Sequence, residues 1–189
     1  PVNDSFDQME IGGVVKDWNI YAPRWCPVEI SKSPDGPEKV LMLKDFDPYD
    51  YAKAVRVFQK SEKINIQFQV YIESNPEILA IEVVSAKGER CVQTELDQKR
   101  NILVKNGIDS LSKLSSFELG RWVLVEFEIN SKQNRYHIRI DGKTIGSKIK
   151  FAVDGQPERI IFRTGKYRLT DNVQKFKSGD KHVPGWDEP

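Results

Sequence analysis

The segment FRTGKYR, residues 162–168, gathers residue types that acid–base chemistry on an anionic substrate requires. It places three cations, Arg163, Lys166 and Arg168, around a glycine and Tyr167, directly after an apolar pair. A cation can neutralise a substrate carboxylate, and a tyrosine beside it can transfer a proton. The segment therefore predicts either a catalytic edge or a lip that binds an acidic ligand.

A structural interpretation of the same segment is also available, and we favour it. Phe162 would anchor the end of a core strand, and Gly165 would turn the chain outward, so that the three cations form an exposed basic rim. Between residues 141 and 181 the chain has ten Lys and Arg against five Asp and Glu. The segment lies inside this local excess of positive charge.

Other residues with catalytic chemistry lack partners at a useful spacing. Glu126 and Glu128 are two apart in VEFEI, so they project to the same face of a strand, together with Trp122 and Leu124. We expect a mixed outer sheet surface there. His137 lies in YHIRI, and alternation places it opposite the apolar side chains of that strand. We expect it to lie on a sheet surface.

The two cysteines, Cys26 and Cys91, allow either a disulfide or two buried free thiols, and we favour the free thiols. The chain contains two histidines and neither CxxC nor HxxxH, so zinc and haem chemistry are not predicted. We therefore expect no cofactor.

Exposed flat aromatic rings can stack on sugars, and several aromatic residues lie close together near the start of the chain. Trp18 and Tyr21 are the surface candidates for such a platform. Trp25 we expect to pack in the core beside Cys26 and Val28.

Composition excludes several classes of protein. The chain has 29 Lys and Arg against 28 Asp and Glu, so it has no overall field that would recruit nucleic acid. No apolar run is long enough for a transmembrane helix, and we expect no membrane insertion. The chain begins with Pro1, as expected of a mature secreted protein or an excised domain. We expect a secreted, periplasmic or cell-surface location.

Period-two alternation of apolar residues recurs along the chain and predicts strands. In INIQFQVYI, residues 64–72, the apolar side chains share one face, and the opposite face presents Gln67, Gln69 and Tyr71. This polar face is a candidate for ligand binding, although a merely solvated surface has the same pattern. Further strands are predicted at Val40–Leu43, Ala54–Phe58, Ile78–Val84, Cys91–Leu96, Ile102–Val104, Trp122–Ile129, Tyr136–Ile140 and Arg159–Phe162.

So many strands in one chain predict an all-β fold, two antiparallel sheets packed as a jelly-roll sandwich with at most one short helix. That helical turn is expected near residues 109–115. Turn signals such as Lys87-Gly88, Asn106-Gly107 and Asp141-Gly142 separate the strands. We expect the sandwich to occupy residues 1–170 as one monomeric domain and residues 171–189 to form a polar tail or linker.

The segment RWVLVEFEINSKQNRYHIRIDGK, residues 121–143, resembles the signature hairpin of concanavalin A-like and laminin G-like jelly rolls. In that hairpin a Trp opens one strand, and after a polar turn the second strand ends in Asp-Gly-Lys. The opening DSFDQMEIGGVVKDWNIYAPRW is similar to the start of such domains. The resemblance implies a possible structural calcium ion near the chain ends, for which Asp4 and Asp7 are weak candidates.

FRTGKYR resembles the Lys-x-Gly-x-Tyr strand of jelly-roll polysaccharide lyases. The resemblance implies that Tyr167 would be the catalytic acid and base, with Arg163 and His137 assisting. The Gln-x-His and Arg-x-Glu strands of that family have no clear match in this chain. An incomplete catalytic set argues against the lyase.

PERIIFRTGKYR with the tail that follows it is also similar to accessory jelly rolls attached to sialidase-like propeller proteins of gut Bacteroidetes. Our leading hypothesis is a non-catalytic, carbohydrate-associated module of a secreted polysaccharide-degrading protein, which binds glycan or braces an adjacent catalytic domain. The ligand-binding candidates are Trp18, Tyr21, Gln67, Gln69, Tyr71, Arg163, Lys166 and Arg168. The alternative is a polysaccharide lyase or glycoside hydrolase that acts on acidic glycans.

Overall fold

The computed structural model describes residues 1–74 and 77–166. The described chain divides into two compact units. Unit 1 contains Pro1–Asn3 and the described residues of Val55–Phe162, and unit 2 contains Asp4–Ala54 together with residues 163–166. The boundaries fall inside strands β4 (Lys53–Val57) and β13 (Pro157–Thr164), so each of these strands begins in one unit and ends in the other.

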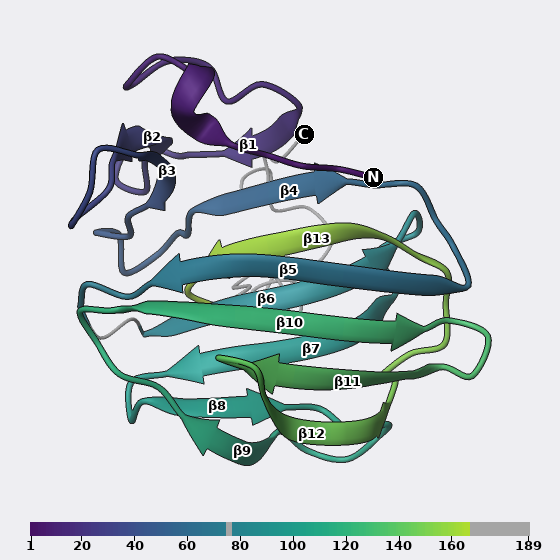
Figure 1. Cartoon of the computed structure of the whole chain (residues 1–189). Helices are drawn as coiled ribbons and strands as arrows, with labels where there is room; N and C mark the ends of the chain where they lie inside the picture. The colour runs from purple at the N-terminus through teal and green to yellow at the C-terminus, as the bar shows by residue number, and fades with distance from the viewer. Residues whose placement is uncertain (75–76, 167–189) are drawn as a thin grey trace, which may run out of the picture. The chain divides into compact units, whose positions relative to one another are not determined.

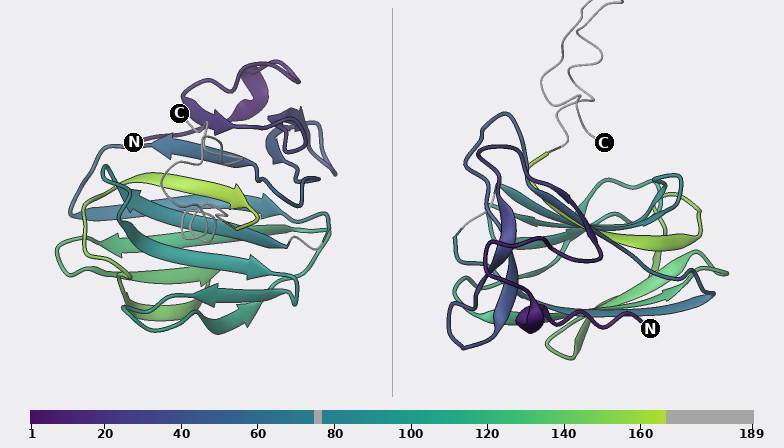
Figure 2. Two further views of the ribbon diagram at one scale, coloured as in Figure 1. Left: turned by 180° about the vertical axis from the view of Figure 1, so that it is seen from behind. Right: turned by 90° about the horizontal axis from the view of Figure 1, so that it is seen from above.

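Unit 1 is a two-sheet sandwich. Its four-stranded sheet has the order β12-β11-β10-β5, and its larger sheet has, within this unit, the order β4-β13-β6-β7-β8-β9. In Figure 1 the first sheet lies nearer the viewer, and Figure 2 (left) shows the larger sheet from behind. The remaining strands of unit 1 are β5 (Lys63–Tyr71), β6 (Ile78–Ser85), β7 (Arg90–Asp97), β8 (Asn101–Val104), β9 (Ser112–Ser116), β10 (Trp122–Asn130), β11 (Arg135–Ile140) and β12 (Lys143–Lys150).

The core of unit 1 lies between its two sheets. Alternate residues of β10 are buried, and these side chains pack with the inward faces of β5, β6 and β11. The largest buried rings, Phe127 and Tyr136, pack edge to face with their centroids 6.2 Å apart. The predicted all-β jelly-roll sandwich is thereby confirmed.

The hairpin between β10 and β11 joins two of the predicted strands. Phe127 pairs with Ile138 and Ile129 with Tyr136, so apolar partners face the core together. After β11, Asp141 (φ 49°) and Gly142 (φ 75°) both adopt left-handed backbone, as a two-residue hairpin turn requires.

Unit 2 contains the 3-10 turn η1 (Phe6–Gln8), β1 (Trp18–Tyr21) beside β4, and the two-stranded ribbon of β2 (Val28–Lys32) and β3 (Lys39–Leu43). Its small core is formed by Cys26, Val28, Ala52 and Ala54.

Two local expectations need correction or confirmation. The helical turn predicted near residues 109–115 is wrong, because Ser112–Ser116 forms the edge strand β9. Cys26 and Cys91 are both buried free thiols, which confirms the favoured alternative.

Among the described residues, no helix has the length and apolar character needed to cross a membrane. The predicted boundary at residue 170 lies outside the described residues.

Candidate functional site

Strands β5 and β10 together present a continuous outer surface, opposite the core of unit 1. Their antiparallel register brings three pairs of outward side chains directly opposite each other: Tyr71 with Trp122, Gln69 with Leu124, and Gln67 with Glu126. Cross-strand partners of this kind lie about 5 Å apart at Cβ. We call these six residues the β5–β10 face.

Two aromatic rings form one end of the β5–β10 face. The rings of Tyr71 and Trp122 lie 5.4 Å apart at an interplanar angle of 61°, and both side chains are half-buried. Gly120, at φ 71°, precedes Trp122, and a side chain at that position would approach the Tyr71 hydroxyl to 3.8 Å. This is an ordinary contact distance, so the left-handed backbone at position 120 is what favours glycine there.

Asp141 holds the loop beside the aromatic end. Its Oδ1 accepts a hydrogen bond from the backbone N–H of Leu124, and its Oδ2 accepts one from Arg121, both at close to 2.9 Å. These two interactions, the Leu124 N–H first, lower the pKa of Asp141 below its ordinary value. Arg121 also pairs with Glu118 at 2.8 Å, so that this loop is fixed by charged hydrogen bonds.

The polar part of the face has uncommitted hydrogen-bonding groups. Gln67 and Gln69 are exposed, and with Glu126 their side chains make no hydrogen bond or ion pair to any described residue. Beyond them, Arg139 pairs with Glu128 at 2.7 Å. The face can therefore offer two amides and one carboxylate to a ligand.

His137 lies on β11, on the same outer surface of the four-stranded sheet. Its Nδ1 is 2.9 Å from the hydroxyl of Ser147. The prediction that His137 lies opposite the apolar face is confirmed, since its neighbours Tyr136 and Ile138 are fully buried and His137 is not. A catalytic role for His137 stays a prediction.

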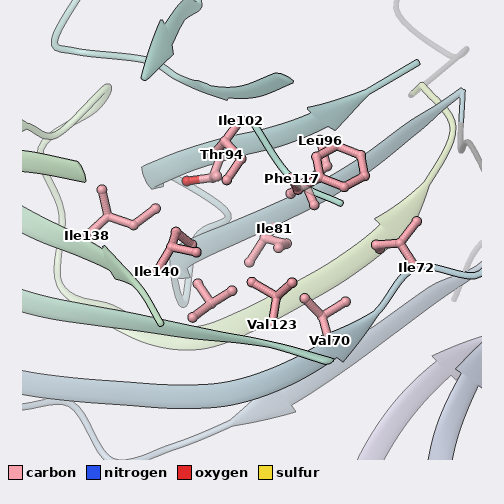
Figure 3. A pocket seen from close by; sticks show the side chains of 11 residues that line it. Val70, Ile72, Ile81, Thr94, Leu96, Ile102, Phe117, Val123, Ile138 and Ile140 are labelled. Atoms are coloured by element: carbon pink, nitrogen blue, oxygen red, sulfur yellow. The ribbon is translucent and has the colours of Figure 1, made fainter. Parts of the chain in front are cut away.

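The interior of the sandwich contains a small cavity but no room for a ligand. The space is about 10 Å³, on the order of what one water molecule requires. Figure 3 shows apolar side chains around it, aliphatic ones from both sheets and the ring of Phe117, with Thr94 as the polar exception. A sugar cannot enter this cavity, so the cavity itself is not a glycan site.

The two aromatic candidates of unit 2, Trp18 and Tyr21, pack against other side chains and are not fully exposed. Trp18 is half-buried, lies 6.0 Å from the ring of Phe6 and packs on the small core. The Tyr21 hydroxyl donates to the carboxylate of Asp50 at 3.1 Å, and its ring lies 5.3 Å from that of Tyr51. A direct role of either residue in binding stays a prediction.

The prediction that Arg163 belongs to an exposed rim is wrong, because its residue is only 4% exposed. Its guanidinium lies 5.7 Å from the ring centroid of Tyr51 and donates a hydrogen bond to the carbonyl of Gly165. The turn at Gly165 is confirmed by its φ of 65°. Lys166 is exposed, while Tyr167 and Arg168 lie outside the described residues.

The weak calcium candidates lie near the start of unit 2. The carboxylate of Asp7 accepts hydrogen bonds from the Lys39 backbone N–H at 2.9 Å and from the Ser5 hydroxyl at 2.7 Å. Among the described residues, no three His, Cys, Asp or Glu side chains gather as a metal site would require. A calcium ion held by Asp4 and Asp7 stays a prediction.

Sequence reasoning assigned the aromatic residues of unit 2 wrongly in one respect. Trp25, expected in the core, is 54% exposed, and the guanidinium of Arg24 lies 5.0 Å from its ring centroid. Phe46 and Tyr49, which we did not predict as site residues, are 70% and 79% exposed. Strand alternation next to the buried Cys26 would have placed Trp25 outside.

Comparison with protein families and solved structures gives this geometry a context. The family model described as "Sialidase-like, CBM domain" matches residues 18–176. A solved sialidase superposes with a TM-score of 0.82 at 27% sequence identity, over 100% of this chain and 16% of the sialidase chain. The chain therefore spans a small part of that relative. No curated protein matches the chain.

More distant structures share the fold. A β-glucanase of Bacillus licheniformis superposes with a TM-score of 0.52 at 9% identity, covering 89% of this chain and 88% of the glucanase. A second glycosidic hydrolase gives a TM-score of 0.53 at 10% identity, with 94% and 88% coverage. At these identities the likeness shows a concanavalin A-like jelly roll and nothing further.

Proposed function

We propose that this chain, which belongs to the sialidase-like carbohydrate-binding domain family, holds glycan on its β5–β10 face. The observation that carries the proposal is the combination on one open surface of an aromatic pair with amide and carboxylate groups that have no described partner. A sugar has apolar C–H faces that stack on aromatic rings and hydroxyl groups that both donate and accept hydrogen bonds. The face offers both kinds of contact.

Glu126 is the single charged side chain of the β5–β10 face. Its carboxylate accepts hydrogen bonds from hydroxyl groups and repels a carboxylate on a sugar. The proposed ligand is therefore a stretch of uncharged, hydroxyl-rich sugar units in an extended glycan.

The wider setting is part of the same proposal. The module would act beside a catalytic domain of a longer glycan-degrading protein, because the sialidase that it resembles is several times longer than this chain. We place it in a secreted, periplasmic or cell-surface protein, as a monomeric laminin G-like domain of the kind that Bacteroidetes use. A structural calcium ion near Asp4 and Asp7 is also a proposal.

Affinity electrophoresis tests the proposed function. The chain is run through native gels that contain a neutral β-glucan, alginate or a sialylated mucin, and its retardation is compared with a gel without glycan. Gln69→Ala and Glu126→Ala each remove a hydrogen-bonding group worth about 0.5–1.5 kcal/mol, so the dissociation constant should rise roughly threefold to tenfold.

Gln133→Ala is the matched control, because Gln133 is an exposed glutamine in the turn between β10 and β11. It should bind as the unaltered chain does. Absence of retardation in all three gels would disprove glycan binding by this chain. Equal binding by the Gln69, Glu126 and Gln133 variants would move the site away from the β5–β10 face.

A further inference from the structure

The β2–β3 ribbon of unit 2 continues beyond its two strands. Val28 pairs with Leu43 at the end of the ladder. The next two backbone bonds keep the register, with Lys44 N–H donating to the Pro27 carbonyl at 3.0 Å and Phe46 N–H to the Trp25 carbonyl at 2.9 Å. Trp25 and Phe46 are therefore cross-strand neighbours.

This register determines which way each side chain points. Cys26 and Asp45 share the inner face, where the thiol donates to Asp45 Oδ1 at 3.4 Å and Cys26 is fully buried. Trp25 lies in the turn that the Cys26 N–H closes onto the Pro23 carbonyl at 2.8 Å, and we infer that its side chain and that of Phe46 lie on the outer face, away from Cys26 and Asp45. Their exposures of 54% and 70% agree with this.

Local hydrogen bonds fix the loop that follows the aromatic pair. The backbone N–H of Asp47 donates to Asp45 Oδ1 at 3.2 Å, and that of Tyr49 donates to Asp47 Oδ1 at 2.8 Å. The backbone beside Phe46 is thus fixed before any ligand arrives, which lowers the entropy lost on binding.

The size of the pair favours a small ligand over a protein surface. Two aromatic side chains can bury about 300–500 Å² when completely covered. A stable protein interface needs roughly 800 Å² from each partner. The sequence neighbours Arg24 and Lys44 are exposed cations, and Tyr49, at 79% exposure, is the one further exposed ring of this segment, so even three rings offer less apolar area than a protein interface.

We propose that Trp25 and Phe46 form a second glycan contact, in which the two rings stack on the C–H faces of sugar units in a polysaccharide. The Arg24 guanidinium lies over one face of the Trp25 ring, so the sugar stacks on the other face, and Lys44 donates hydrogen bonds to the sugar oxygens. This inference rests on the proposed glycan binding and adds a site that is separate in the sequence from the β5–β10 face.

Alanine variants in the same glycan-containing gels test the proposal. Trp25→Ala and Phe46→Ala should each weaken retardation by the glycan that the chain binds, with an increase in the dissociation constant of about threefold to tenfold for the loss of one stacked ring. Trp25→Tyr, which keeps a flat ring, should recover part of the affinity. Val14→Ala is the matched control, since Val14 is a 91% exposed apolar residue of the same unit.

The remaining outcomes overturn the inference in distinguishable ways. If the β5–β10 variants weaken retardation and the Trp25 and Phe46 variants do not, the second contact is wrong and the proposed function stands. If the unaltered chain is retarded in no gel, the proposed function is wrong, and the second contact, which depends on glycan binding, is wrong as well. If size-exclusion chromatography shows a dimer that Phe46→Ala converts to a monomer, the rings are covered by a second copy of the chain.

Discussion

Cys26 and Cys91 are buried thiols whose protonation can be followed directly. Burial raises the pKa of Cys26 to about 12, with the charge of Asp45 adding to the effect. Burial also raises the pKa of Cys91 to about 11, and the negative charge of Glu89 is the second cause. A thiol-specific disulfide reagent at pH 8 should therefore label neither residue in the folded chain and both in denaturant.

The same shifts predict a loss of stability at high pH. A group whose folded pKa is raised contributes stability that is present below its unfolded value, here 9.0, and is lost as the pH rises through the folded value. The free energy of unfolding should fall as the pH rises from 9.0 to about 11 for Cys91 and to about 12 for Cys26, and less steeply in a Cys26→Ala, Cys91→Ala double variant. Rapid labelling of the folded chain would contradict this account of both thiols.

The positions of individual side chains were predictable where alternation was applied strictly. Gln67, Gln69 and Tyr71 lie opposite the core because β5 alternates without interruption. Trp25 was assigned to the core beside Cys26, although neighbours in an extended chain cannot share a face. The burial of Arg163 depends on its contact with Tyr51, far away in the sequence, and alternation carries no such information.

At the scale of elements, strands with a regular apolar face were predicted, the edge strand β5 among them, and the edge strands β9 and β12 were missed. β5, β10 and β11 have apolar residues at alternate positions because one face of each is core. β9 and β12 stand at the ends of their sheets, and most of their residues are exposed or half-buried. With few apolar side chains, an edge strand carries little periodic signal.

Edge strand β12 nevertheless has a strict requirement at Gly146. A Cβ there would lie 2.6 Å from Cδ1 of Ile149, 2.8 Å from Leu114 and 2.9 Å from Ile138. Gly146→Ala should therefore lower the free energy of unfolding by about 1–3 kcal/mol through overpacking, as measured by denaturant unfolding.

A second variant identifies the cause. Ile149→Val removes the nearest methyl group and alone should cost about 0.5–1.5 kcal/mol, because Ile149 is buried. If overpacking is responsible, the double variant will be more stable than the sum of the single effects predicts. Simple additivity would exclude the clash with Ile149 as the reason.

The part of the chain that the structure describes has two cores of unequal size, and this division was not predicted. In the small core, Cys26 and Val28 pack with Ala52 and Ala54. The two alanines lie about two dozen residues further along the chain, and their side chains are too small to give a strong apolar pattern. The fold class followed from the repeated alternation and the turn residues. Which strands share a unit depends on long-range packing, for which the sequence has no local pattern.

The balance of charge over the whole chain gives a test between two functions, a module that binds uncharged sugars and an enzyme that acts on acidic glycans. The chain has one net positive charge, and the β5–β10 face has a single carboxylate, so binding through stacking and neutral hydrogen bonds should be insensitive to salt. Between about 0.01 M and 1 M salt the Debye length falls from roughly 30 Å to 3 Å, which weakens any exposed ion pair. We expect retardation by the preferred glycan to change less than about twofold over this range. An acidic glycan held by the basic segment around Lys166 would instead lose affinity steeply, and that result would favour a lyase or hydrolase of acidic glycans over a module that binds uncharged sugars.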